Sequence, residues 1–404
     1  MHYNTSKWPI IGAQGRLPTR RKSDWANLPM HLLDSILENL VSRLDYIRFS
    51  VVCMPWYCVA KDNKRKFDEM SSCRHNPPLL LIQTPKKPEW NLYNPMEDQV
   101  LGLQLKFPKK RLCGSSKGWL IAMNMDLVVT LINPFLRVKG RQKRADSIIH
   151  LPPLACPDRL LDRVKAEFVN KATLSADPIL EADKCIVMVI YEPTGHDLAF
   201  IRLNKDSSWT YIVDEKFSSL QDVVHVGDKF YVVEQMGRLF SFDITTDQSI
   251  SNKQLVAGDT LEDFEYEVKT YIVVLDDNEW LMVQRVVEFD HGGRWTKEVR
   301  IFKLDFDKYK WIETETLGDV ALFLGDNFSI SVKALNFSGC LPNCIYFNYD
   351  FDRINSYPKN RIYDDYGVYN IESRSFSQAY TQEAKRLLEK TMQPPYWVVP
   401  TLQL

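Results

Sequence analysis

The sequence predicts an α+β multidomain protein, in which a small three-helix segment precedes a mainly antiparallel all-β domain. Apolar residues recur at helical spacing between residues 24 and 62, whereas from residue 77 onward short β-rich segments follow one another with turn residues between them. Short strands without interleaved helices are typical of an all-β fold. For residues 77–404 we expect a β-propeller of about five to seven blades.

Composition limits the classes of function that the chain can have. Its 404 residues suffice for two or three domains, and a formal net charge of −1 provides no basic field for nucleic acid. The eight cysteines are irregularly spaced, which in a long chain favours reduced thiols over a disulfide framework. Neither a signal peptide nor an apolar run of about 20 residues is present. We expect a nuclear and/or cytoplasmic protein that binds neither nucleic acid nor membranes.

The first element is a polar, basic leader at residues 1–23, which we expect to be disordered. Its cluster Arg20-Arg21-Lys22 is compatible with part of a nuclear localisation signal, but three basic residues fit a solvated tail better. Residues 63–76 are expected to link the helical segment to the β domain.

The helical segment, residues 24–62, reads as three short helices. Pro29 suits the first turn of a helix, where its missing N–H costs nothing, and a stripe at helical spacing follows: Leu33, Ile36, Leu37 and Leu40. Residues 42–45 interrupt this pattern and supply capping side chains for a second helix. Pro55 then opens a third helix.

The β domain contains a weak internal repeat. Residues 198–212, 238–250 and 299–314 each combine an alternating strand, a polar turn and the start of a further strand. Four-stranded units of about 40–65 residues are typical of propeller blades, and a large β-sandwich is the competing architecture. One late helix is expected within residues 380–392, and residues 396–402 are expected to return as a closing strand.

The helical segment raises the question of what it packs against. A piece of about 40 residues cannot normally sustain its own core. Two explanations remain open at this point. Either the helices pack onto the β domain, or they form a docking module that completes its core in a complex.

The order of residues in this segment resembles the F-box family. The matching positions are Leu28-Pro29, Leu32-Leu33, Ile36-Leu37, Leu40, Asp45, Arg48, Val52-Cys53 and Trp56. Pro55 departs from the family pattern, where a polar residue is common. Downstream, residues 115–124, 131–135, 150–154 and 396–402 resemble plant F-box proteins that carry a kelch-like "domain of unknown function 295".

This resemblance implies a substrate-receptor subunit of an SCF-type E3 ubiquitin ligase, itself non-catalytic. The F-box would bind a Skp-type adaptor and, through it, a cullin, and the propeller would bind the protein target for ubiquitination. The implied adaptor-binding residues are Leu28, Pro29, Leu32, Leu33, Ile36, Leu37, Leu40, Val52 and Trp56. Some of them would face the adaptor and some would hold the helices together. The alternative is a non-catalytic scaffold or regulator outside ubiquitination, with its helices packed on its own propeller.

Catalytic motifs are missing from the sequence. It contains neither a phosphate-binding Gly-rich loop nor a Gly-x-Ser-x-Gly elbow, and the seven histidines and the pair Cys340 and Cys344 lack partners at metal-ligand spacing. We expect no catalytic residue, metal site or cofactor, and a propeller enzyme or small-ligand binder is the weakest hypothesis. The target-binding residues are unknown, but residues 288–295 and 350–366 are candidate recognition loops.

Overall fold

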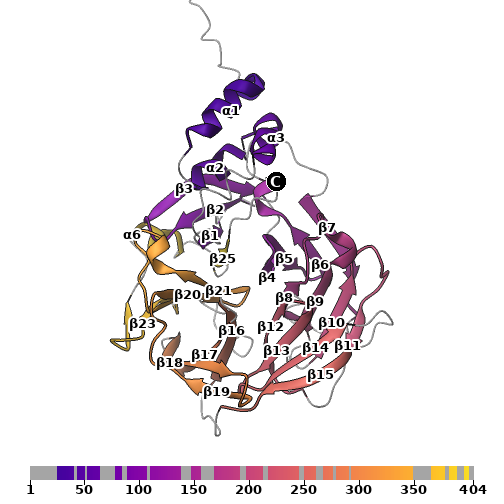
Figure 1. The fold of residues 1–404 in the computed structure, drawn as a ribbon, viewed down its shortest axis with the longest axis vertical. Coiled ribbons are helices and arrows are strands. Elements are labelled where there is room, and N and C mark those ends of the chain that lie inside the picture. The colour runs from indigo at the N-terminus through magenta and orange to yellow at the C-terminus, as the bar shows by residue number, and fades with distance from the viewer. Residues whose placement is uncertain are drawn as a thin grey trace, which may run out of the picture.

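The computed structural model describes most of the chain. The described residues are 25–40, 43–50, 52–63, 78–83, 89–106, 110–137, 147–155, 168–191, 197–212, 217–244, 250–260, 267–275, 279–290, 293–348, 365–377, 382–388 and 395–399. Within them, six antiparallel or mixed sheets of four or five strands form the blades of a β-propeller (Figure 1). The propeller prediction is confirmed, with six blades, and the sandwich alternative is wrong. The leader 1–23 and nearly all of the linker 63–76 lie outside the described residues.

The first three blades follow the chain from residue 79. Blade A contains β1 (Leu79–Gln83), β2 (Glu89–Asn94), β3 (Gln99–Lys106) and β25 (Tyr396–Val398). Blade B contains β4 (Arg111–Ser116), β5 (Trp119–Met123), β6 (Val128–Ile132) and β7 (Ile148–Pro153). Blade C contains β8 (Val169–Leu174), β9 (Ile186–Tyr191), β10 (Asp197–Arg202) and β11 (Thr210–Ile212).

The other three blades complete the ring. Blade D contains β12 (Leu220–Val226), β13 (Lys229–Glu234), β14 (Leu239–Ile244) and β15 (Ile250–Ala257). Blade E contains β16 (Glu267–Val274), β17 (Trp280–Asp290), β18 (Gly293–Asp305) and β19 (Lys310–Glu313). Blade F contains β20 (Val320–Gly325), β21 (Phe328–Lys333), β22 (Cys344–Phe347), β23 (Gly367–Asn370) and β24 (Ser375–Ser377). Short 3₁₀ turns are η2 (Pro134–Arg137), η4 (Ala182–Lys184) and η5 (Ala334–Asn336).

The ring is closed by the C-terminal strand. β25 pairs antiparallel with β1, with Trp397 opposite Leu80, so blade A is built from both ends of the propeller segment. The closing strand expected from the sequence is thus confirmed. The innermost strands β25, β4, β8, β12, β16 and β21 are neighbours around the central axis. Blade F departs from the others because β20 and β22 pair in parallel while β21 takes the inner position.

Burial along the strands follows their place in the ring. All residues of β1 and β5 are buried, because neighbouring blades cover both faces of such strands, which therefore read as continuous apolar runs. The outer strands β19 and β24 are largely exposed. The late helix is present as α6 (Gln382–Leu388), and the rest of the expected range 380–392 lies outside the described residues.

The N-terminal helices sit beside blade A (Figure 1). They are η1 (Trp25–Asn27), α1 (Met30–Glu38), α2 (Arg43–Ser50) and α3 (Met54–Asp62). Pro29 is the residue before α1, and Pro55 lies in the first turn of α3, as expected. One apolar cluster joins buried side chains of these helices, such as Leu33 and Tyr57, to Leu79, Trp90 and other residues of blades A and B. The helices therefore share a core with the propeller. None of the helices in the described part of the chain is long and apolar enough to span a membrane.

Candidate functional sites

The helical segment divides its apolar side chains between a core and the solvent. Of the residues implied to bind an adaptor, Leu33, Leu37 and Trp56 are buried, and Leu28, Ile36 and Leu40 pack half-buried against the same core. Pro29, Leu32 and Val52 are exposed. The buried residues therefore hold the helices together in the free protein, and adaptor contact by any of the nine stays a prediction.

Polar and aromatic contacts fix the geometry of these helices. The Tyr46 hydroxyl of α2 donates to the Ala60 carbonyl of α3 at 2.7 Å, and the rings of Phe49 and Trp56 lie 4.6 Å apart. The Trp56 indole N–H donates to the Trp25 carbonyl at 2.9 Å, which ties η1 to α3. These bonds give the exposed side chains a defined scaffold.

Large apolar side chains are exposed on this scaffold. The exposed fractions are 57% for Trp25, 54% for Met30, 43% for Leu32 and 43% for Val52. We call these four residues the N-terminal apolar set. Trp25 and Met30 are not among the residues that the resemblance implies, although Trp25 precedes the expected stripe and Met30 directly follows Pro29.

The channel at the centre of the propeller contains a buried ion pair. The Lys171 ammonium of β8 lies 3.1 Å from the Asp222 carboxylate of β12. The same carboxylate accepts the Ile272 backbone N–H of β16 at 3.1 Å, and Lys171 reaches the Gly325 carbonyl at 3.4 Å. These charges connect blades C, D, E and F, so their evident role is to hold the ring.

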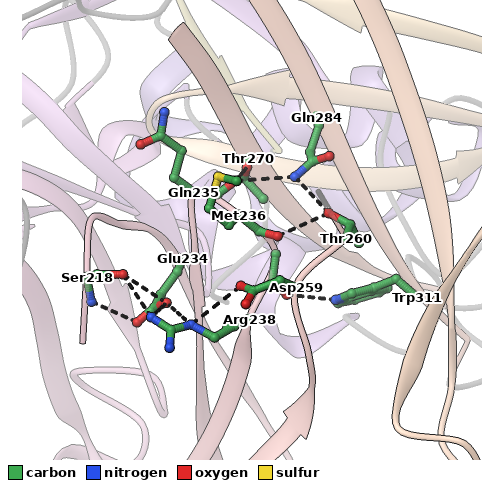
Figure 2. A network of polar contacts seen from close by, with 11 residues as sticks. Ser218, Glu234, Gln235, Met236, Arg238, Asp259, Thr260, Thr270, Gln284 and Trp311 are labelled. Carbon is green, nitrogen blue, oxygen red and sulfur yellow. Dashed lines mark hydrogen bonds and ion pairs between the residues drawn. The ribbon is translucent and has the colours of Figure 1, made fainter. Parts of the chain in front are cut away.

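A polar network links blades D and E on one face of the ring (Figure 2). It is built around the turn between β13 and β14, where the Gln235 carbonyl accepts bonds from Thr270 at 2.9 Å and from Gln284 at 3.2 Å. The Trp311 indole N–H of β19 donates to the Gly237 carbonyl at 2.7 Å. The network therefore positions this turn against blade E.

One edge of the network is charged. Arg238 pairs with Glu234 at 2.6 Å and lies 3.5 Å from Asp259. Ser218 bonds to the same Glu234 carboxylate through its backbone N–H at 2.8 Å and its hydroxyl at 3.1 Å (Figure 2). Each charged group in this edge has a partner of opposite sign, which makes it a structural clamp.

Arg285 makes the corresponding link from blade E to blade F. Gln284 and Arg285 are consecutive on β17, so their side chains point to opposite faces of the sheet, and both are fully buried. The Arg285 guanidinium lies 3.0 Å from the Asp365 carboxylate and donates to the Asn348 carbonyl at 3.2 Å. Asp365 in turn accepts the Thr296 backbone N–H at 2.9 Å.

These contacts bring together described residues at the borders of the two candidate recognition loops. The first loop, residues 288–295, is followed directly by Thr296. The second loop, residues 350–366, has Asp365 and Tyr366 as its last two residues. Residues 291–292 and 349–364 lie outside the described residues, but the described ends of both segments meet at Arg285. We call Arg285, Trp295, Thr296, Asn348 and Asp365 the E/F corner.

A groove runs beside this corner on the outside of the ring. It has a volume of about 280 Å³ and is lined by β18, residues 313–315 and blade F. Its charged groups pair with one another: Arg300 holds Glu313 at 2.9 Å, and Arg374 pairs with Glu315. Arg300 also lowers the pKa of the Glu313 carboxyl through this hydrogen bond.

Titratable groups in the described residues do not form a reactive constellation. Burial raises the pKa of the Cys113 thiol to about 11 and that of Cys340 to about 12, so these thiols stay protonated at neutral pH. Burial also lowers the pKa of His225 to about 4. Within the part of the chain that the structure describes, no three His, Cys, Asp or Glu side chains are grouped to hold a metal ion.

Comparison with known proteins places the chain among plant relatives. It is 23% identical to the F-box protein At2g17690 of Arabidopsis thaliana, over 80% of this chain and 91% of the relative. It is 24% identical to the F-box protein SKIP23 of the same plant, over 93% of this chain and 95% of the relative. A solved structure titled as BBS1N in complex with ARL6DN is 12% identical and covers 63% of this chain and 70% of its own, at a TM-score of only 0.33.

The family model named KIB1-4 beta-propeller matches residues 92–370, which is more than half of the chain. This range runs from β2 of blade A to β23 of blade F and so covers most of the ring. The resemblance to the kelch-like "domain of unknown function 295" stays a prediction. The chain belongs to the KIB1-4 beta-propeller family, and its relatives in Arabidopsis thaliana are named F-box proteins.

Proposed function

We propose that this protein is the substrate-receptor subunit of an SCF-type E3 ubiquitin ligase. Its N-terminal helices bind a Skp-type adaptor and, through it, a cullin, while the propeller binds the protein to be ubiquitinated. The protein itself carries out no step of ubiquitin transfer. Action in the nucleus, the cytoplasm or both is part of the same proposal.

The N-terminal apolar set is the observation that carries this proposal. Leu32 and Val52 are large aliphatic side chains, each 43% exposed, on a segment that buries Leu33, Leu37 and Tyr57 in the core shared with the propeller. Large apolar residues exposed on a small helical module are typical of a protein-binding site. The names of the relatives supply the class of partner, since they are called F-box proteins.

The shared core of helices and propeller bears on the alternative. Packing of the helices on blades A and B buries the side chains of Leu33, Leu37 and Tyr57. A scaffold protein whose helices pack on its own propeller requires this arrangement. It leaves the N-terminal apolar set uncovered, however. A receptor that keeps its helices fixed to the ring and offers the exposed residues to an adaptor accounts for both features.

Co-purification from plant cells tests the proposal. The full-length chain is expected to bring down a Skp-type adaptor and a cullin, and Leu32→Asp with Val52→Asp is expected to lower adaptor recovery about tenfold or more, because a charge cannot be buried in an apolar interface without a large cost. Leu335→Asp is the matched control, since Leu335 is an exposed leucine of η5 on blade F, far along the chain from the helices.

Two outcomes would contradict the proposal. One is undiminished adaptor recovery by the Leu32→Asp, Val52→Asp variant while Leu335→Asp also binds normally. The other is a wild-type chain that recovers neither adaptor nor cullin, which would favour the scaffold outside ubiquitination.

A further inference from the structure

The hairpin of β17 and β18 extends beyond the rest of blade E. These strands have 11 and 13 residues, and β16 follows β17 only as far as Val287. Beyond that point, within the described residues, the hairpin strands pair with each other, as Glu288 with Trp295. On the other side, β19 pairs with β18 from Phe302 onward. Among the described residues, the end of the hairpin therefore extends past both neighbouring strands of blade E.

An exposed tryptophan lies on this free end. Trp295 is 45% exposed, and its strand neighbour Thr296 is buried against Asp365. Lys297 and Glu298 beside it are exposed and opposite in charge, and Lys297 pairs with Glu288 at 3.0 Å, so these residues supply no basic field for nucleic acid or an anionic membrane. A half-exposed tryptophan on a fixed support is the usual kind of anchor in protein–protein interfaces.

Arg285 fixes the support of this tryptophan from below. One guanidinium binds both Asn348 and Asp365, the residues immediately outside 349–364, and also donates to the Thr296 hydroxyl at 2.7 Å. The three anchored residues come from two chain segments in blades E and F, which Thr296 and Asp365 also join directly by hydrogen bonds. A planar guanidinium with several donors suits this task better than any other side chain.

We propose that the E/F corner is the target-binding surface of the receptor, with Trp295 as its anchor and Arg285 as the positioning residue that holds the surrounding segments. The partner is a protein surface with an apolar recess for the Trp295 indole. This inference rests on the proposed function. The location is consistent with it, because blade F lies between blade E and blade A, beside which the N-terminal helices sit (Figure 1), so adaptor and target can bind at separate places on the ring.

Site-specific photo-crosslinking tests the anchor. The full-length chain carrying Leu32→Asp and Val52→Asp, which is expected to retain targets without degrading them, receives a photoreactive amino acid at position 295 or at position 309. Tyr309 is the matched control because it is an exposed aromatic residue at the opposite end of β18. Proteins crosslinked at 295 and not at 309 are expected, and Trp295→Ala is expected to lower their co-purification about tenfold or more, with no effect from Tyr309→Ala. Equal crosslinking at both positions, or no loss with Trp295→Ala, would overturn the inference.

Arg285→Met tests the positioning role, with Gln284→Met as its control. Both variants remove a fully buried polar side chain from the same strand, but Gln284 contacts blade D whereas Arg285 contacts the corner. Only Arg285→Met is expected to reduce recovery of the crosslinked targets, about tenfold, and to speed amide hydrogen exchange in 293–299 and 365–370. Equal target recovery by the two variants would overturn the role of Arg285.

Asp365→Asn decides the same question if Arg285→Met fails to fold. This variant keeps the shape of the side chain and weakens the ion pair, and the same loss of target is expected with circular dichroism unchanged. Full target recovery by a folded Asp365→Asn protein would contradict the proposal. Adaptor co-purification is measured for every corner variant in a chain that keeps Leu32 and Val52. If the wild-type chain recovers no adaptor, the proposed function is overturned. Crosslinking at position 295 tests the corner independently of adaptor binding.

Discussion

Replacing Trp397 tests whether the three-residue strand β25 closes the propeller. The indole is fully buried, its N–H donates to the Leu324 carbonyl at 3.0 Å, and its ring meets Phe323 edge-on at 5.0 Å between centroids. The Trp397 carbonyl accepts the Asn327 side-chain amide at 2.9 Å. Trp397 therefore joins blade A to blade F, the first and last blades of the ring.

The size of the effect depends on the replacement. Trp397→Ala leaves a large cavity between two blades and is expected to lower the free energy of unfolding by about 3–5 kcal/mol. Trp397→Phe keeps an aromatic ring in place and loses the N–H. The Leu324 carbonyl still accepts the Asn348 backbone N–H at 3.1 Å, so it keeps a hydrogen-bond donor. The expected loss in the free energy of unfolding is therefore about 1–2 kcal/mol.

Urea unfolding of the full-length protein, followed by circular dichroism, measures both values. Trp295→Ala is the control, because it removes a tryptophan that is exposed, and it is expected to change the unfolding free energy by less than about 0.5 kcal/mol. If Trp397→Ala costs no more than Trp295→Ala, β25 does not hold the ring closed and the reasoning is refuted.

Three further predictions follow from buried groups elsewhere in the ring. Gly114→Ala is expected to destabilise the contact of blades B and C, because a Cβ there would lie 2.3 Å from the Ala172 carbonyl oxygen; a thermal midpoint equal to that of the wild type would contradict this. Lys171→Met leaves the Asp222 carboxylate buried without its cation and is expected to cost about 3–5 kcal/mol in urea unfolding, with recovery when Asp222→Leu is added; absence of recovery would show that the pair is not the cause. For His225, burial lowers the pKa to about 4, so the unfolded chain binds more protons between that pH and the ordinary pKa of about 6.5, and stability is expected to fall as the pH drops through this window. His225→Gln should remove that part of the pH dependence, and an unchanged pH profile would argue against it.

The architecture could be read from the sequence because local signals agreed with the tertiary structure. Continuous apolar runs such as Leu79–Gln83 and Trp119–Met123 are strands covered on both faces, and the turn residues between them set a blade-sized period. The number of blades could not be fixed, since the strands vary in length and blade F inserts β21 inside β20. The parallel pairing of β20 with β22 has no local sequence signal, because pairing direction depends on partners distant in the chain.

The candidate sites were predictable only in part. The apolar stripe identified the helical segment, but the resemblance alone does not separate Leu32, which is exposed, from Leu33, which is buried. Both are implied adaptor-binding residues, and only Leu33 joins the core shared with blades A and B. Residues 288–295 and 350–366 were recognised separately as candidate loops, whereas the contact between their described borders depends on Arg285, the one arginine of a strand that also holds Gln284, Glu288 and Asp290. That residue was the available signal, because a charge within a buried strand requires a partner.

The shared core has a consequence for how a receptor of this kind would work. If the helices were tethered by a flexible linker, the distance between adaptor and target would vary, and a target lysine would meet the transfer machinery only by chance. Here buried Leu33 and Tyr57 lie in one cluster with Trp90 of blade A. The clamps at Lys171–Asp222, Arg285–Asp365 and the Gln235 turn then join successive blades by buried polar bonds. Under the proposed function, the ring acts as a rigid spacer that sets the separation of the adaptor surface from the E/F corner.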